Sequence, residues 1–265
     1  MGRTLDNGEQ NMVMRDELLA YLAGLLRVAD FSDYGPNGLQ VEGGREIRRI
    51  VGGVTACQAL VDAAVDRAAD ALLVHHGYFW NGEDPCVVGM KQRRLRALLG
   101  ADINLLAYHL PLDAHPELGN NARLAQRLDF RVTGDFARPG DRGPAIAMHG
   151  EPAAPTTPTA LAAHIARCLG REPLHIPAAS AQIRRVAWCS GAAQGYLEAA
   201  AALGADAFIS GEISEHTVHA AREVGIHYYA AGHHATERGG VMALGAHLAE
   251  HFGLAFEFVD IPNPV

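Results

Sequence analysis

The sequence predicts an α/β protein built from two similar halves. Residues 47–53, 56–69 and 71–74 follow the order strand, alanine-rich helix, strand. A unit of this kind forms a parallel pair of strands with a right-handed crossover. The same pattern returns 136 positions later without a gap, which indicates an internal duplication. We therefore expect two duplicated α/β domains, each a mixed sheet flanked by helices.

The repeat also aligns the residues that follow the strands. His75 and His76 fall on Gly211 and Glu212 at the offset of 136. At the next strand the offset is 124, and each half ends that strand with a histidine followed four residues later by a carboxylate. These two pairs are His109 with Asp113 and His233 with Glu237.

Local signals place the other elements. Apolar residues at helical spacing predict an opening helix over 15–28, and residues 33–38 are a dense turn signal. Thr157 before Pro158 predicts the capped start of a short helix around 160–169. Each half closes with a further helix, and a last strand follows near the end of the chain. The bounds expected for these three elements are 121–128, 241–252 and 255–259.

The elements group into four segments. Residues 1–13 are polar and unlike a secretory signal, so we expect a disordered extension there, or a misassigned start before Met14. Residues 14–138 are the first α/β half and residues 183–265 the second. Residues 139–182, which are rich in proline and threonine, are expected to connect the two halves.

Composition opposes several classes of partner. The chain has 22 Lys and Arg against 30 Asp and Glu, and its net charge of −8 opposes adhesion to nucleic acid or to an anionic membrane. No apolar run approaches the ~18 residues that a spanning helix needs. The four cysteines lack C-x-x-C spacing, which fits a reduced cytosol. We expect a cytoplasmic protein with no membrane and no nucleic-acid partner.

Histidines and carboxylates at strand ends predict a metal site between the two halves. Mixed imidazole and carboxylate donors suit zinc, manganese, iron or nickel, and a carboxylate can bridge two ions. Side chains alternate faces along a strand, so His75 and His76 cannot easily bind one ion together. We assign them to different ions, with Glu237 as the bridge and a metal-activated water as the nucleophile. The predicted ligands are His75, His76, Asp113, His233 and Glu237.

Several residues keep alternative interpretations. A His-His pair taken alone is more often surface or core than ligand, and its coincidence with duplicated strand ends favours metal binding. His109 is a sixth ligand, a hydrogen-bond partner, a proton carrier or a core histidine bonded to backbone. Glu212 and His216 are candidate acid/base groups, with helix capping as the alternative for Glu212. Residues 190–193 fit a tight turn better than a phosphate-binding loop.

Five motifs together resemble a known family. They are similar to the Nif-three-like dinuclear metal-centre family, in particular its short bacterial members of the YbgI type. The resemblance implies two similar α/β domains around a buried dimetal site, assembled into a toroidal homohexamer. It also implies the activity named GTP cyclohydrolase 1 type 2, a hydrolytic ring-opening of a purine nucleotide. The motifs are DYGPNGLQVEG at 33–43, VHHGYFW at 74–80, HLPLD at 109–113, GNN at 119–121 and GHHATERGG at 232–240.

The family's metal positions correspond to the five predicted ligands without a substitution. We therefore expect two divalent ions per chain and a metal-dependent hydrolase that acts on a small nucleotide-like substrate. His109 and Glu212 are the candidate catalytic residues. The alternative is a metal-stabilised ring that acts as a scaffold or regulatory protein without turnover.

Overall fold

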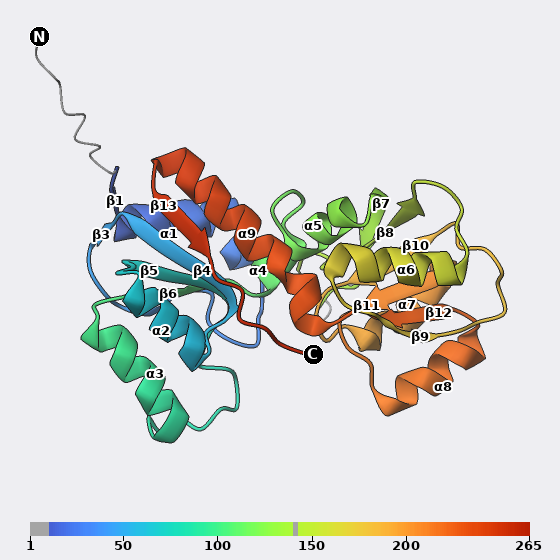
Figure 1. Ribbon diagram of the computed structural model, residues 1–265, viewed down its shortest axis with the longest axis horizontal. Helices are drawn as coiled ribbons and strands as arrows, with labels where there is room; N and C mark the ends of the chain where they lie inside the picture. Colours follow the sequence, from blue (N-terminus) through green and yellow to red (C-terminus); the bar gives the residue numbers. More distant parts are fainter. Residues whose placement is uncertain (1–10, 140–142) are drawn as a thin grey trace, which may run out of the picture.

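The computed structural model describes residues 11–139 and 143–265. Its helices and strands form two α/β lobes that lie side by side, each built on one mixed β-sheet (Figure 1). The α/β class expected from the sequence is confirmed. Among the described residues, no helix is long and apolar enough to cross a membrane.

The first lobe is a five-stranded sheet with helices on both faces. In spatial order its strands are β13 (Ala255–Phe258), β4 (Arg49–Thr55), β5 (Ala71–His76), β6 (Asn104–Ala107) and β2 (Gly38–Val41). All neighbours are parallel except β6 and β2, which are antiparallel. The helices that cover the sheet are α1 (Arg15–Leu25) and α9 (His233–Phe252) on one face, and α2 (Gln58–Asp66) and α3 (Gly89–Gly100) on the other.

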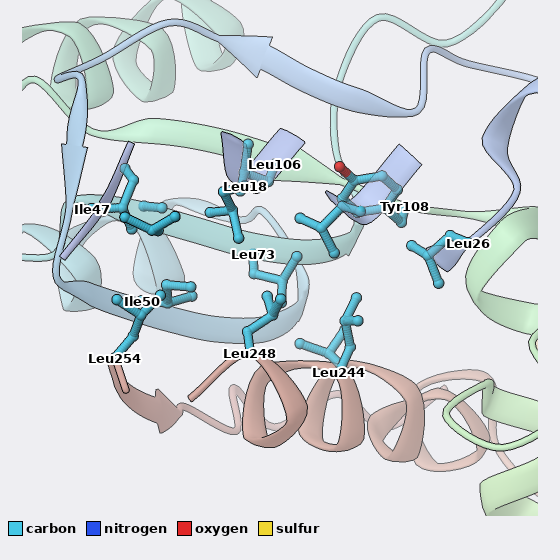
Figure 2. Close-up of a cluster of buried hydrophobic side chains, with 14 of the residues drawn as sticks. Leu18, Leu26, Ile47, Ile50, Leu73, Leu106, Tyr108, Leu244, Leu248 and Leu254 are labelled. Carbon is cyan, nitrogen blue, oxygen red and sulfur yellow. The ribbon is translucent and has the colours of Figure 1, made fainter. Parts of the chain in front are cut away.

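Side chains point alternately to the two faces of this sheet, and a hydrophobic core forms on each face. Leu73 packs against α9, and Figure 2 shows Leu244 and Leu248 pointing toward it. The neighbouring Leu72 faces the other way, where it belongs to the cluster that contains Leu60 of α2. Because each such side chain contributes about 1.5–3 kcal/mol when buried, the two clusters fix the sheet and therefore the end of β5.

The second lobe is a six-stranded sheet. In spatial order its strands are β7 (Phe130–Phe136), β8 (Ala147–Pro152), β10 (Val186–Cys189), β11 (Ala207–Ser210), β12 (His227–Ala230) and β9 (Leu174–Ile176). Only β10, β11 and β12 are parallel to one another. Its helices are α5 (Asn120–Arg127) and α6 (Pro158–Leu169) on one face, and α7 (Leu197–Ala202) and α8 (Glu215–Val224) on the other.

Short elements complete the chain. The helix α4 (Leu110–Ala114) follows β6 and lies where the two lobes meet (Figure 1). Two 3-10 turns, η1 (Val28–Asp30) and η2 (Gln194–Tyr196), follow α1 and precede α7. Thr157 caps α6 as the sequence predicts, because its hydroxyl accepts a hydrogen bond of 3.2 Å from the Ala160 amide.

The two sheets share one topology around their parallel strands. In each lobe three consecutive parallel strands carry an antiparallel strand on the outer side of the third, namely β2 on β6 and β9 on β12. Both antiparallel strands precede the parallel strands in sequence, and their first residues, Gly38 and Leu174, are 136 positions apart. This correspondence agrees with the internal duplication expected from the sequence.

The sheets do not follow the expected segment boundaries. β7 lies within residues 14–138 but forms the edge of the second sheet, whereas β13 lies within 183–265 and joins the first sheet. Residues 139–182, expected to be a connection, supply β8, α6 and β9. The prolines there do not interrupt structure, because Pro152 ends a strand and Pro158 begins a helix.

The last residue of the expected N-terminal extension belongs to a strand. Residues 1–10 of the expected segment 1–13 lie outside the described residues. Val13, by contrast, is buried and pairs with Ile47 in the small sheet formed by β1 (Val13–Met14) and β3 (Glu46–Ile47). The pairing buries an apolar side chain that the polar composition of the segment does not reveal.

The helix α9 begins at His233, well before the expected start at residue 241. Gly239 and Gly240 suggest a loop in the sequence, yet both are helical. A Cβ at Gly240 would overlap the side chain of Asn120 on α5, so the missing side chain permits the two helices to approach closely. Packing therefore outweighs the low helix propensity of glycine.

Candidate metal centre

Two adjacent imidazoles stand at the carboxyl end of β5. His75 is fully buried and His76 is partly buried, and their ring centroids lie 4.5 Å apart. The strand continues through both residues, so they are its last two positions rather than a loop after it. The carboxyl ends of parallel strands are the usual ligand-binding edge of an α/β sheet.

The helix α4 supplies a carboxylate to this edge. His109 is the N-cap of α4, and Asp113 lies one turn later, buried, with its Oδ1 3.5 Å from Nε2 of His75. The same oxygen accepts hydrogen bonds from Asn120 (2.9 Å) and from the hydroxyl of Ser190 in the second lobe (3.2 Å). Asp113 is therefore held in one orientation by groups from both lobes.

The start of α9 completes the cluster. His233 and Glu237 occupy i and i+4 positions on the helix, so their side chains lie on the same face, with His233 Nε2 3.1 Å from Glu237 Oε2. Glu237 Oε1 lies 3.5 Å from Nε2 of His75, while its Oε2 lies 3.4 Å from Nε2 of His76. One buried carboxylate thus faces both histidines of β5, each through a different oxygen.

The five residues sort into two overlapping groups with the spacing of metal ligands. The first group is His75, Asp113 and Glu237, and the second is His76, His233 and Glu237. In each group the donor atoms lie within 4.8 Å of one another. Glu237 belongs to both of these groups, and each contains one imidazole of β5; a third group joins His75 and His76 with His109.

Unpaired buried atoms show that the donor set fits cations. Nε2 of His75 and Oε2 of Glu237 are buried, and neither finds a hydrogen-bond partner among the residues that the structure describes. A polar atom left in that condition costs about 1–3 kcal/mol, so such atoms are rare unless a ligand satisfies them. Imidazole nitrogens and carboxylate oxygens are the donors that first-row divalent ions accept.

Hydrogen bonds on the far side of each ring aim the free nitrogens at the cluster. Nδ1 of His75 bonds the carbonyl of Tyr108 (2.9 Å), and Nδ1 of His76 lies 3.1 Å from the hydroxyl of Thr55. Glu212 holds Nδ1 of His233 at 2.6 Å. Such contacts orient the histidines of metal sites. The contact indicates that Glu212 orients His233. The side chain of Glu212 does not cap α8.

The charges of the cluster are strongly coupled. Burial lowers the pKa of His75, but the carboxylates of Asp113 and Glu237 outweigh it and raise that pKa to about 9. Burial and the neighbouring His75 lower the pKa of His76 to about 3. Burial also opposes the charged form of His233, yet the neighbouring carboxylates of Glu237 and Glu212 raise its pKa to about 9. Without ions, the carboxylates therefore hold protons on two of the three imidazoles at neutral pH.

A cavity of about 280 Å³ opens beside the cluster. Its walls come from both lobes, and the phenol rings of Tyr34 and Tyr196 line it. The residues that connect it to the cluster are His109, Asp113, His233 and Glu237. A small molecule in the cavity would therefore contact the predicted ligands directly.

Not every candidate from the sequence reaches this centre. His216 is exposed on α8 and belongs to none of the ligand groups found among the described residues. The amides of Gly191 and Ala193 already bond the hydroxyls of Thr236 and Ser210, which agrees with the tight turn and leaves neither amide for a phosphate.

Asp33 is a residue of the centre that the sequence prediction missed. Its buried carboxylate bonds Nδ1 of His109 at 2.7 Å, although the two residues are 76 positions apart. The turn signal at 33–38 and the family-like motif there were the only indications in the sequence. Neither indicates which residue Asp33 contacts.

Comparison with known proteins agrees with the fold and with the motifs. A family model described as Duf34/NIF3 (NGG1p interacting factor 3) matches residues 13–264. The "GTP cyclohydrolase 1 type 2 homolog" of Pseudomonas aeruginosa is 59% identical over 239 residues, which cover 90% of this chain and 94% of the relative.

Solved structures give the same result. The structure described as protein ybgI, of unknown function, has a TM-score of 0.91 and 51% identity, and the match covers 96% of this chain and all of that one. TTHA1606 from Thermus thermophilus has a TM-score of 0.86 and 37% identity, again over 96% of this chain and all of that one. The resemblance found in the sequence is confirmed, and the chain belongs to the Duf34/NIF3 family.

Proposed function

We propose that this protein binds two divalent metal ions and acts as a metal-dependent hydrolase on a small nucleotide-like substrate. One observation carries the proposal: Glu237 presents a different oxygen to each of two ligand groups at the wall of a cavity. In this proposal His75 and Asp113 hold one ion, His76 and His233 hold the other, and Glu237 binds both.

The residues of the chain prepare the site for that chemistry. Divalent ions in such a site act as Lewis acids and lower the pKa of water. Asp113 is fixed by Asn120 and Ser190, so it can bind without reorganisation. Glu212 orients His233, and this contact favours a positioning role for Glu212 over the acid/base role expected from the sequence.

The substrate class rests on the relatives and on the cavity. The curated relatives carry the name GTP cyclohydrolase 1 type 2 homolog, which makes ring-opening of a guanine nucleotide the first reaction to try. The cavity lined by Tyr34 and Tyr196 suits a planar ring. Among its described lining residues there is no lysine or arginine, so the ions would have to bind any phosphate group.

Metal analysis and a turnover screen test the proposal together. Wild-type protein loaded with Mn²⁺, Zn²⁺, Fe²⁺ or Ni²⁺ is expected to retain about two ions per chain. Metal-loaded protein is then screened against GTP, other nucleotides, phosphoesters and cyclic amides. Glu215→Ala is the matched control for Glu237→Ala, because Glu215 is an exposed carboxylate outside the ligand groups found among the described residues.

The outcomes separate the two functions under consideration. Turnover that requires the ions and disappears in Glu237→Ala supports the hydrolase. Two bound ions without turnover on any of these substrates support the alternative, a metal-stabilised scaffold. A chain that retains no ion contradicts both.

Assembly and location are part of the same proposal. We propose a homohexameric ring, on the family resemblance, and its mass is measurable by light scattering. We also propose a cytoplasmic location, which the four free cysteines support because a reducing compartment keeps thiols unpaired.

A further inference from the structure

His109 is held by a carboxylate that belongs to a different part of the chain. Asp33 lies in the turn before β2, and its side chain is only 3% exposed. One oxygen accepts from Nδ1 of His109 at 2.7 Å, and the other accepts from the amide of Leu110 at 2.9 Å and from Asn37 at 2.8 Å. Asp33 therefore fixes both the imidazole of His109 and the start of α4.

The contact directs the other ring nitrogen. With its proton on Nδ1 and bonded to Asp33, a neutral His109 presents Nε2 as an unprotonated donor. The three histidines already assigned to the centre, His75, His76 and His233, also have a hydrogen-bond partner at Nδ1. Carboxylate–histidine pairs of this type are characteristic of metal ligands.

The two lobes supply a second, independent comparison. His109 and His233 follow the third parallel strand of their respective sheets, and each precedes a carboxylate by four residues. Both have a carboxylate at Nδ1, at 2.7 Å for Asp33 and 2.6 Å for Glu212. Because the two carboxylates come from unrelated positions in the lobes, the duplication alone does not explain their shared geometry.

His109 also lies close enough to take part in the centre. His75, His76 and His109 form a third group whose donor atoms lie within 4.8 Å of one another. The ring of His109 is 5.0 Å from that of His75, and Trp80 meets it edge-on at 5.1 Å. The ring is thus enclosed on one side by the ligands and on another by an indole.

We propose that His109 is a sixth donor of the metal centre and that Asp33 is its positioning residue. The inference rests on the proposed function, because it requires ions bound by the other five residues. It favours a ligand role among the alternatives that the sequence leaves open for His109, because Nδ1 of His109 bonds a buried carboxylate rather than the backbone and its ring lies beside two predicted ligands.

Cobalt(II) binding tests the proposal without any assay of turnover. Titration calorimetry gives the affinity of each binding step, and the visible d–d absorption of Co²⁺ reports the number and type of donors. We expect Asp33→Asn to weaken one step about 10- to 100-fold. We expect His109→Gln to weaken the same step at least as much and to change the Co²⁺ spectrum.

A neighbouring pair provides matched controls. His234 bonds Asp260 at 2.7 Å through Nε2, so it is also a histidine–carboxylate pair, yet it belongs to none of the ligand groups found in the described chain. His234→Gln and Asp260→Asn are expected to bind two Co²⁺ ions with wild-type affinity and spectrum. Circular dichroism of the metal-free variants verifies that each is folded.

Each outcome decides between named alternatives. A His109→Gln variant that binds two Co²⁺ ions with wild-type affinity and spectrum overturns the proposal, even if the variant has lost turnover. Should Asp33→Asn fail to fold, His109→Gln decides alone, because it leaves the bonds of Asp33 to Leu110 and Asn37 in place. A wild-type chain that binds no Co²⁺ contradicts the proposed function instead, which is a separate result.

Discussion

Both lobes contain three parallel strands in sequence order, β4, β5 and β6 in the first and β10, β11 and β12 in the second, but they contribute to the centre differently. At the end of its second parallel strand the first lobe presents His75 and His76, whereas the second lobe has Gly211 and Glu212 at the matching positions. At the end of the third parallel strand both lobes have a histidine and a carboxylate four residues apart. One strand end therefore differs between the lobes, and the other has the same residue types in both.

The difference explains why the candidate donors gather in one cluster rather than two. A Cβ at Gly211 would lie 2.6 Å from the carbonyl oxygen of Gly191 and 2.7 Å from Cα of His233, so a histidine cannot occupy this position. Glu212 turns instead toward His233 and supports it. The first lobe thus provides donors at this strand end, and the second lobe provides support for a donor.

The largest effect is expected where the two lobes share one residue. Glu237→Ala removes the carboxylate that faces both histidines of β5, so we expect the loss of both ions from about two per chain. Metal content after gel filtration measures this, with Glu215→Ala as the control. Retention of one ion in Glu237→Ala would show that the two groups bind independently.

A second substitution tests the close packing around Gly211, the position in the second lobe that matches His75. Gly211→Ala would push its Cβ against Gly191 and His233, and overpacking of this kind costs about 1–3 kcal/mol of unfolding free energy. Because His233 would be displaced, binding of one ion should weaken as well. The control is Gly225→Ala, which ends α8 with φ +74° and open space around it. It should cost about 1–2 kcal/mol and leave metal binding intact. Urea unfolding and metal titration measure both; equal metal affinities in the two variants would contradict the comparison.

The supporting role of Glu212 predicts a smaller effect. Glu212→Gln keeps the size of the side chain but removes the charge that orients His233, and such changes weaken metal binding about 10- to 100-fold. Only one of two binding steps should change. If both binding steps weakened equally in this variant, Glu212 would affect both metal ions rather than act through His233 alone.

The smallest expected signal is the release of protons on metal binding. His75 and His233 have pKa values of about 9 in the metal-free chain, so both are protonated at pH 7 and must become neutral to bind an ion. We expect about two protons to be released at pH 7 and metal affinity to fall as the pH falls. Calorimetry in buffers of different ionisation enthalpy counts these protons. No release at pH 7 would mean that the carboxylates do not hold protons on these histidines.

The sequence predicts much of this architecture because its signals are periodic. Apolar runs mark β5, β10 and β12, and the repeat at 136 positions relates the two halves. The five proposed ligands are identifiable because each follows or ends a strand, or lies one turn later. The structure brings all five together, although His233 and Glu237 lie on a helix that begins earlier than expected.

The features that the sequence does not reveal depend on long-range contacts. Asp33 is an ordinary turn residue until the fold places it against His109. Gly240 suggests a loop until Asn120 is found packed against it. The pairing of β13 with β4 links strands that are about 200 positions apart, and no local pattern encodes that choice of partner.

That last pairing has a consequence for how the protein is made. The first sheet receives its edge strand β13 and the covering helix α9 only from residues 233–258, which are synthesised after every strand of the second sheet. Until then Leu73 and its neighbours on that face lack their partners, so the nascent first lobe exposes apolar surface while the second sheet can already form. The lobe whose synthesis begins first can therefore complete its core only when residues 233–258 have been made.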